Sequence, residues 1–76
     1  MKRIGIKDAI DKCKKESLHM RIYCENEYRD IGPEAEFTLW EFEPTLKIEG
    51  LEAIVYYDID AITEIEVIKD VKVIPV

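Results

Sequence analysis

The chain has 76 residues, which is enough for a single small domain. Charged residues make up 37% of it and apolar residues 47%, a balance that excludes a disordered tail and a low-complexity chain. A domain of this size has a thin core and little room for a substrate cleft, so most classes of enzyme are disfavoured.

The net charge of −6 is unevenly distributed along the chain. Residues 1–24 hold seven basic and three acidic side chains, a balance of +4, whereas residues 25–76 hold four basic and fourteen acidic ones, a balance of −10. An acidic surface repels nucleic-acid phosphates and anionic membranes. No run of about 18 apolar residues is available to span a bilayer, and no apolar signal stretch follows Met1. The sequence therefore predicts a soluble, cytoplasmic protein that binds no membrane, and it disfavours nucleic acid as a partner.

The first predicted elements are an amphipathic helix over 6–16 and a hairpin. Apolar side chains recur three and four residues apart along the helix, with lysines and aspartates on its other side. After it, the apolar period changes to two, which predicts a strand over 18–24. Asparagine tolerates left-handed backbone, so Glu25 and Asn26 are expected to reverse the chain into a second strand over 27–31.

The stretch from Pro33 to Pro44 fits two interpretations. Alternating side chains over 37–42 are typical of a strand, whereas Thr38 and Glu41 match a capping box that opens a helical turn. We adopt the strand over 37–42 and leave the helical turn open.

The carboxyl-terminal half is expected to be strand. Twelve of the seventeen Ile and Val residues lie in 48–76, and β-branched side chains favour a pleated sheet. Two hairpins are expected, joined by one tight helical turn over 58–62. Their strands are predicted at 45–49, 52–57, 63–68 and 71–76.

Together these elements predict an α+β domain that is mainly β, with the helix packed on a curled antiparallel sheet of five or six strands. The order of a long hairpin, a strand, a one-turn helix and a final strand resembles small SH3-like and Sm-like barrels, which implies a barrel as the alternative architecture. This resemblance concerns the fold and implies no activity. The apolar segment 71–76 suits pairing across the two-fold axis of a homodimer as well as barrel closure.

Residues able to carry catalysis or hold a metal are few. His19 is the chain's single histidine, and on the outward face of its strand it would lie in solvent, where nothing shapes a catalytic pocket. Cys13 and Cys24 fall on apolar faces and are predicted to be core thiols, because structural zinc needs four Cys or His ligands and the chain has three. Asp58 and Asp60 suit a cation, but capping of a turn explains them better. We therefore predict no catalytic residue, no metal site and no cofactor.

Carboxylates two residues apart recur along the predicted strands, where such a pair projects from one face about 6.6 Å apart. Two adjacent rows of these pairs approach the charge density of a nucleic-acid strand, although the wet face of any antiparallel sheet carries such residues for solubility. The leading hypothesis is a non-catalytic protein-interaction module whose acidic sheet face binds, and so regulates or inhibits, a basic nucleic-acid-binding protein. The predicted acidic contacts are Glu34, Glu36, Glu41, Glu43, Glu64 and Glu66.

Exposed aromatic side chains would supply the anchors of such an interface. The predicted aromatic contacts are Trp40, Phe42, Tyr28 and Tyr57. The alternative function is binding of RNA or DNA by an Sm-like or SH3-like fold through a basic patch on the helix and first strand. That patch would comprise Lys12, Lys14, Lys15 and Arg21.

Overall fold

The computed structural model describes residues 1–69, which form one α-helix, six strands and one 3₁₀ turn. The helix, α1, spans Arg3–Glu16, and the 3₁₀ turn, η1, spans Ile59–Ala61. The strands are β1 (His19–Cys24), β2 (Glu27–Ile31), β3 (Glu36–Leu39), β4 (Thr45–Glu49), β5 (Ile54–Asp58) and β6 (Ile62–Ile68). The strand expected over 71–76 lies outside the described residues.

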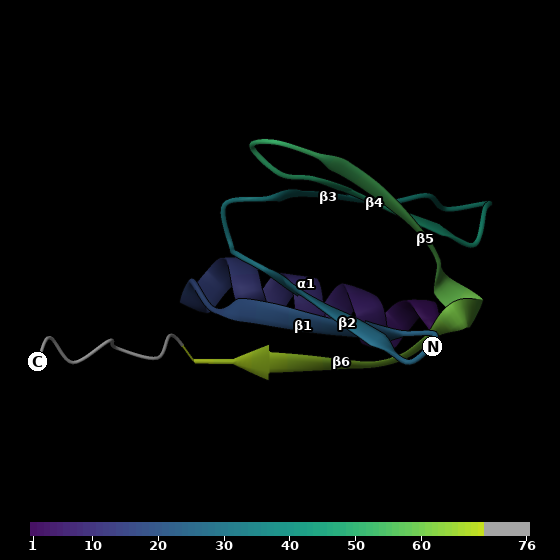
Figure 1. Cartoon of the computed structure of the whole chain (residues 1–76), viewed down its shortest axis with the longest axis horizontal. Helices are drawn as coiled ribbons and strands as arrows, with labels where there is room; N and C mark the ends of the chain where they lie inside the picture. The colour runs from purple at the N-terminus through teal and green to yellow at the C-terminus, as the bar shows by residue number, and fades with distance from the viewer. Residues whose placement is uncertain (70–76) are drawn as a thin grey trace, which may run out of the picture.

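The strands form two separate antiparallel sheets (Figure 1). In sheet A, β1 lies between β2 and β6, and in sheet B, β4 lies between β3 and β5. The predicted α+β class, mainly β with one amino-terminal helix, is confirmed. The single curled sheet and the SH3-like or Sm-like barrel are wrong, because β2 and β3 follow each other in the chain but belong to different sheets. Pro33 has no N–H to continue a ladder, and the chain leaves sheet A there.

The β1–β2 hairpin turns where the sequence predicted it. Glu25 and Asn26 have φ values of 50° and 65°, and Cys24 pairs with Glu27 across the turn. Two consecutive residues with positive φ match the right-handed twist of a two-residue hairpin, and asparagine adopts this conformation readily.

The strand predicted over 37–42 is shorter than expected. β3 ends at Leu39, and residues 41–44 form bends, so neither the last three residues of that strand nor the helical turn is present. The N–H of Trp40 still donates to the carbonyl of Thr45 at 3.3 Å, which closes the loop between β3 and β4. The turn expected over 58–62 is η1, in which the Asp58 carboxylate accepts a hydrogen bond from the N–H of Asp60 at 3.0 Å.

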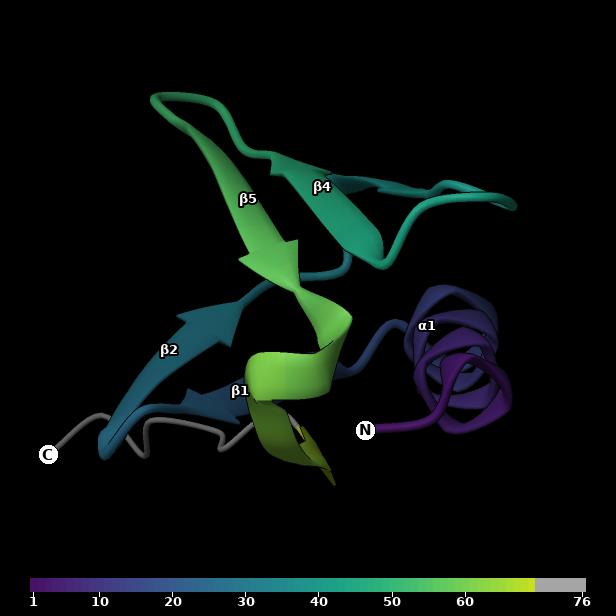
Figure 2. The ribbon, with the colours of Figure 1, turned by 90° about the vertical axis from the view of Figure 1, so that its right-hand side faces the viewer.

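The core lies between the two sheets, and α1 closes one side of it (Figure 2). Ile6 and Cys13 come from the buried face of the helix. The remaining core residues are Met20, Ile22, Ile31, Ala35, Leu46, Ile48, Ile59 and Ile62. The amino group of Met1 donates to the carbonyls of Ile59 and Ile62 at 2.7 and 2.8 Å, which ties the start of α1 to η1.

Candidate partner-binding surface

Basic side chains of α1 hold both ends of β3. The guanidinium of Arg3 donates to the carbonyl of Glu43 at 3.0 Å and also to that of Trp40. The ammonium of Lys14 donates to the carbonyl of Pro33 at 2.8 Å and also to that of Ala35. Because these carbonyls flank β3 on either end, the helix covers this side of sheet B with hydrogen-bonded cations.

The outer face of sheet B, turned away from the core, carries a stacked aromatic pair. The rings of Trp40 and Tyr56 lie 6.3 Å apart at their centroids with an interplanar angle of 4°. Trp40 is 36% exposed and Tyr56 60% exposed, so both rings are open to solvent. Tyr56 pairs with Lys47 of the central strand. The stack therefore spans sheet B from the end of β3 to β5.

Carboxylates share the outer face of sheet B with this aromatic pair. Glu36 and Glu49 are cross-strand neighbours, and Asp58 lies at the end of β5. Lys47 forms an ion pair with Glu49 at 2.8 Å, and the hydrogen bond between them raises the pKa of Lys47. Lys47 is thus neutralised on its own strand, and the outer face of sheet B is acidic around an exposed aromatic surface.

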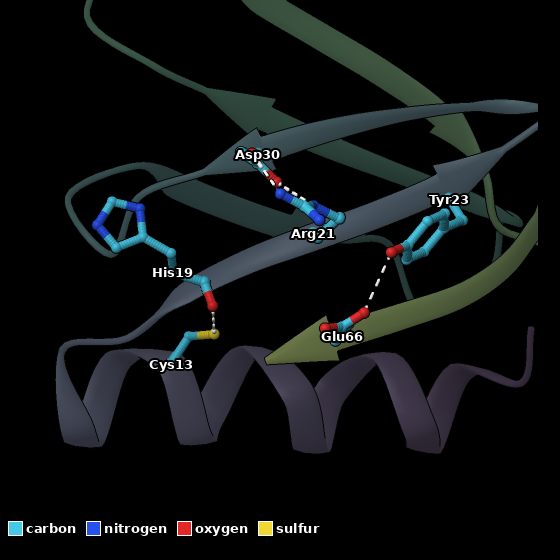
Figure 3. A network of polar contacts seen from close by, with 6 residues as sticks. All are labelled: Cys13, His19, Arg21, Tyr23, Asp30 and Glu66. Atoms are coloured by element: carbon cyan, nitrogen blue, oxygen red, sulfur yellow. Dashed lines mark hydrogen bonds and ion pairs between the residues drawn. The ribbon is translucent and has the colours of Figure 1, made fainter. Parts of the chain in front are cut away.

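Polar side chains on the outer face of sheet A form hydrogen bonds with one another (Figure 3). Arg21 donates to both carboxylate oxygens of Asp30 at 2.7 and 3.1 Å, and its guanidinium lies 4.4 Å from the ring centroid of Tyr28. The hydroxyl of Tyr23 donates to Glu66 at 3.1 Å. The hydrogen bond from Arg21 holds the pKa of Asp30 below its usual range, and the same bond raises the pKa of Arg21. This face therefore presents one ion pair together with the carboxylates of Glu64 and Glu66 on β6.

The structure does not bring the six predicted glutamates onto one face. Glu64 and Glu66 lie on β6 in sheet A, and Glu36 lies on β3 in sheet B. The others occupy connections: Glu34 precedes β3, and Glu41 and Glu43 lie in the loop between β3 and β4. The expected pair of adjacent acidic rows is therefore absent from the described residues, because the strands that carry these glutamates are divided between two sheets.

The predicted aromatic contacts are likewise divided. Trp40 belongs to the exposed stack, Phe42 is 90% exposed in the neighbouring loop, and Tyr28 lies on sheet A. Tyr57 was expected among the exposed aromatic side chains, but it packs against the core, and burial raises the pKa of its hydroxyl. Its neighbour Tyr56 is the outward residue, because Val55 and Tyr57 take the inner positions of β5.

Two of the four residues in the predicted basic patch are engaged within the protein. Lys14 is bound to backbone carbonyls and lies 5.2 Å from the ring centroid of Phe37. Arg21 is paired with Asp30 on another element. Lys12 and Lys15 are exposed on α1. Two of the four cations therefore make contacts within the fold, and Lys12 and Lys15 remain on the surface.

The two cysteines differ in environment. Cys13 is buried, its Sγ lies 3.8 Å from the carbonyl oxygen of His19, and burial raises the pKa of its thiol (Figure 3). Cys24 is half-buried at the tip of the β1–β2 hairpin. Over residues 1–69, no three His, Cys, Asp or Glu side chains are grouped closely enough to hold a metal ion. Within the same range, the one α-helix is too short and too polar to cross a membrane.

Comparison of the chain with known protein families, with curated protein sequences and with solved structures finds no match.

Proposed function

We propose that the protein is a non-catalytic interaction module that binds a basic protein partner through the outer face of sheet B. The observation that carries this proposal is the Trp40–Tyr56 stack, which is exposed to solvent and bordered by carboxylates. Large aromatic side chains on the surface of a small domain expose apolar area that a partner would bury.

The chemistry of this face favours cationic groups. Lysine and arginine side chains bind over the faces of tryptophan and tyrosine rings, and they pair with carboxylates at the rim. Glu36 and Asp58 supply those carboxylates here, since Glu49 is already paired with Lys47. A partner that presents arginine or lysine beside an apolar surface would meet both requirements, and a nucleic-acid-binding protein is one class that does so. Occupation of its basic surface would then compete with nucleic acid, which makes regulation or inhibition the proposed outcome.

Tyr56 offers a matched experiment, because Tyr56 and Tyr28 are both 60% exposed but lie on different sheets. The wild-type protein is used to capture partners from a cell extract, and the affinity of each purified partner is then measured by calorimetry for wild type, Tyr56→Ala and Tyr28→Ala. We expect Tyr56→Ala to weaken binding at least tenfold, as truncation of an aromatic anchor does. Tyr28→Ala should leave the affinity nearly unchanged, and added salt should weaken it. Equal losses in the two variants, or partners with acidic surfaces, would overturn the proposal.

A further inference from the structure

The described residues place no α-helix on the side of the molecule opposite α1, where β2 and β5 lie (Figure 2). There the edge of sheet A formed by β2 and the edge of sheet B formed by β5 border two hollows, of about 350 Å³ and about 280 Å³. Arg29 of β2 and Val55 of β5 line both hollows and so mark the boundary between them. The two hollows are at the lower limit of size for ligand pockets, so they suit the side chains of a bound segment better than a whole cofactor.

The hollows combine an apolar floor with an acidic rim. Ile31 and Ile48 belong to the buried core and reach the larger hollow, and Tyr57 lines the smaller one. Arg29 is the single cation among the lining residues. The acidic lining residues are Asp30, Glu34 and Glu52 in the larger hollow and Glu25 and Glu27 in the smaller. A bound segment that matches this chemistry has apolar side chains that enter the hollows and basic side chains that lie near the rim carboxylates.

The two strands that border the opening differ in how they are protected against pairing. β2 points a charged side chain, Arg29, toward the inner side of the sheet, which is a common device for blocking strand addition to an edge. On β5 the inner positions are Val55 and Tyr57, and the strand carries no lysine or proline. At the far edge of sheet B, β3 is held by the α1 cations. Among the described strands of sheet B, β5 therefore has the unprotected edge.

The register of sheet B identifies the backbone groups at this edge. The N–H of Gly50 donates to the carbonyl of Ala53 at 2.8 Å, and the hydrogen-bonded pairs of an antiparallel ladder then recur at every second residue. Val55 and Tyr57 accordingly direct their backbone groups to β4. The N–H and C=O groups of Ile54 and Tyr56 are directed away from β4, and Ile54 and Tyr56 are also exposed in their side chains.

We propose that an extended segment of another protein, with alternating apolar and basic residues, adds to the edge of β5 as a fourth strand of sheet B. Its apolar side chains enter the two hollows beside Val55 and Tyr57. Its basic side chains lie on the outer side, where Tyr56 offers a ring face and Asp58 a carboxylate. This inference goes beyond the proposed function, because it concerns the edge of the sheet and the hollows and does not depend on Trp40.

The charge of the opening favours such a segment over the β5 strand of a second copy of this chain. That strand has Asp58 and no basic residue, and it would meet a rim that is already acidic. Like charges brought together at an interface oppose association, whereas lysine or arginine in the added strand would be attracted.

A synthetic peptide tests the proposal directly. The probe is a fluorescently labelled heptapeptide that alternates lysine with isoleucine, and its binding to the full chain is measured by fluorescence anisotropy. Ile54→Pro removes one edge N–H without touching the ladder to β4, and loss of one hydrogen bond should weaken binding about fivefold. Charge reversal of the rim by Glu34→Lys together with Glu52→Lys should weaken binding about tenfold at low salt. Circular dichroism of each variant establishes that it is folded.

Peptide variants keep the test independent of the protein variants. N-methylation of the alternate residues whose N–H groups face β5 should abolish binding, whereas N-methylation of the other residues should not. Trp40→Ala should bind the probe as wild type does, because the added strand contacts Tyr56 and Asp58 but not Trp40. Both proposals use Tyr56, so Trp40→Ala and Ile54→Pro, and not Tyr56→Ala, distinguish the failure of one from the failure of the other. The inference is overturned if both N-methylated peptides bind alike, if an analogue with glutamate in place of lysine binds equally well, or if sedimentation shows a dimer that Ile54→Pro dissociates.

Discussion

The two sides of this molecule that flank its core are built in opposite ways. On the closed side, α1 covers β3 with Arg3 and Lys14, each of which donates to two backbone carbonyls. On the open side, β2 and β5 border two hollows, and the rim is acidic. Residues 1–24 carry the basic excess and residues 25–76 the acidic one, so the basic part of the chain is used to close one side of the acidic part.

The two sides differ in whether their charged side chains already bind the protein's own backbone or are available to a partner. A cluster of lysines on a helix suggests a phosphate-binding patch when only the sequence is known. Here the carbonyls of Pro33 and Ala35 already use the Lys14 ammonium. The carboxylates around the opening, by contrast, outnumber the single lining cation, Arg29. The comparison therefore favours the acidic side as the one that a partner meets.

The largest expected effect compares the packing of the two sides. Ile6, on the inner face of α1, is fully buried, so Ile6→Ala should lower the free energy of unfolding by about 2–5 kcal/mol. Val55 is only half-buried at the opening, and Val55→Ala should lower it by about 1 kcal/mol or less. Urea denaturation followed by circular dichroism measures both. A loss for Val55→Ala as large as that for Ile6→Ala would mean that the open side is packed as tightly as the closed one.

A smaller effect is expected from the cations on the closed side. Lys14→Met keeps most of the side-chain length and its contact with Phe37 but removes both hydrogen bonds to carbonyls. Because Lys14 is partly exposed, we expect a loss of about 1 kcal/mol in the free energy of unfolding. Faster hydrogen exchange in β3 should accompany it. The control Lys12→Met, on the exposed side of the same helix, should stay within about 0.5 kcal/mol of wild type; if both variants lose stability equally, α1 does not hold β3 in this way.

The smallest effect concerns the paired charges of sheet A. Because Arg21 lowers the pKa of Asp30 in the folded state, the ion pair stabilises the protein above the ordinary aspartate pKa of 3.8, and this contribution is lost as the pH falls through the lowered pKa. Asp30→Asn should therefore unfold at slightly lower urea than wild type at neutral pH and at the same urea well below pH 3.8. Both groups are at the surface, so salt should reduce the difference at neutral pH. A difference that persists in strong acid would show that the amide disturbs packing and not charge.

The parts of the fold that sequence could predict depend on local signals. Asn26 marks the hairpin turn because it accepts positive φ, and Asp58 marks η1 because its carboxylate caps the turn. The pairing of β1 with β6 has no local signal, since it joins residues such as Tyr23 and Glu64 that are distant in the chain. The division into two sheets depends on the break between β2 and β3, which belong to different sheets, and this is why the single sheet and the barrel were wrong.

The candidate surface was predictable in chemistry but not in position. An acidic surface with exposed aromatic anchors follows from composition, and Trp40 was identified from the sequence. Tyr56 and Tyr57 are adjacent in a strand, so one of them had to face outward, yet which one depends on how β5 packs against the core. The hydrogen bonds of Lys14 were also beyond prediction, because they require the position of a loop about twenty residues away.

The pairing of β1 with β6 has a consequence for how the chain acquires its structure. Tyr23 and Glu66 interact across 43 residues, and all of sheet B is inserted between them, whereas each strand of sheet B pairs with its immediate neighbour in the chain. Closing a long loop costs conformational entropy before any contact repays it, so the sheet of neighbouring strands should form first and the β1–β6 ladder last. During synthesis on the ribosome, the edge of β1 that pairs with β6 would remain unpaired until β6 has emerged. The speed of folding is thus expected to depend on the length of the β3–β5 insertion more than on the helix that precedes it.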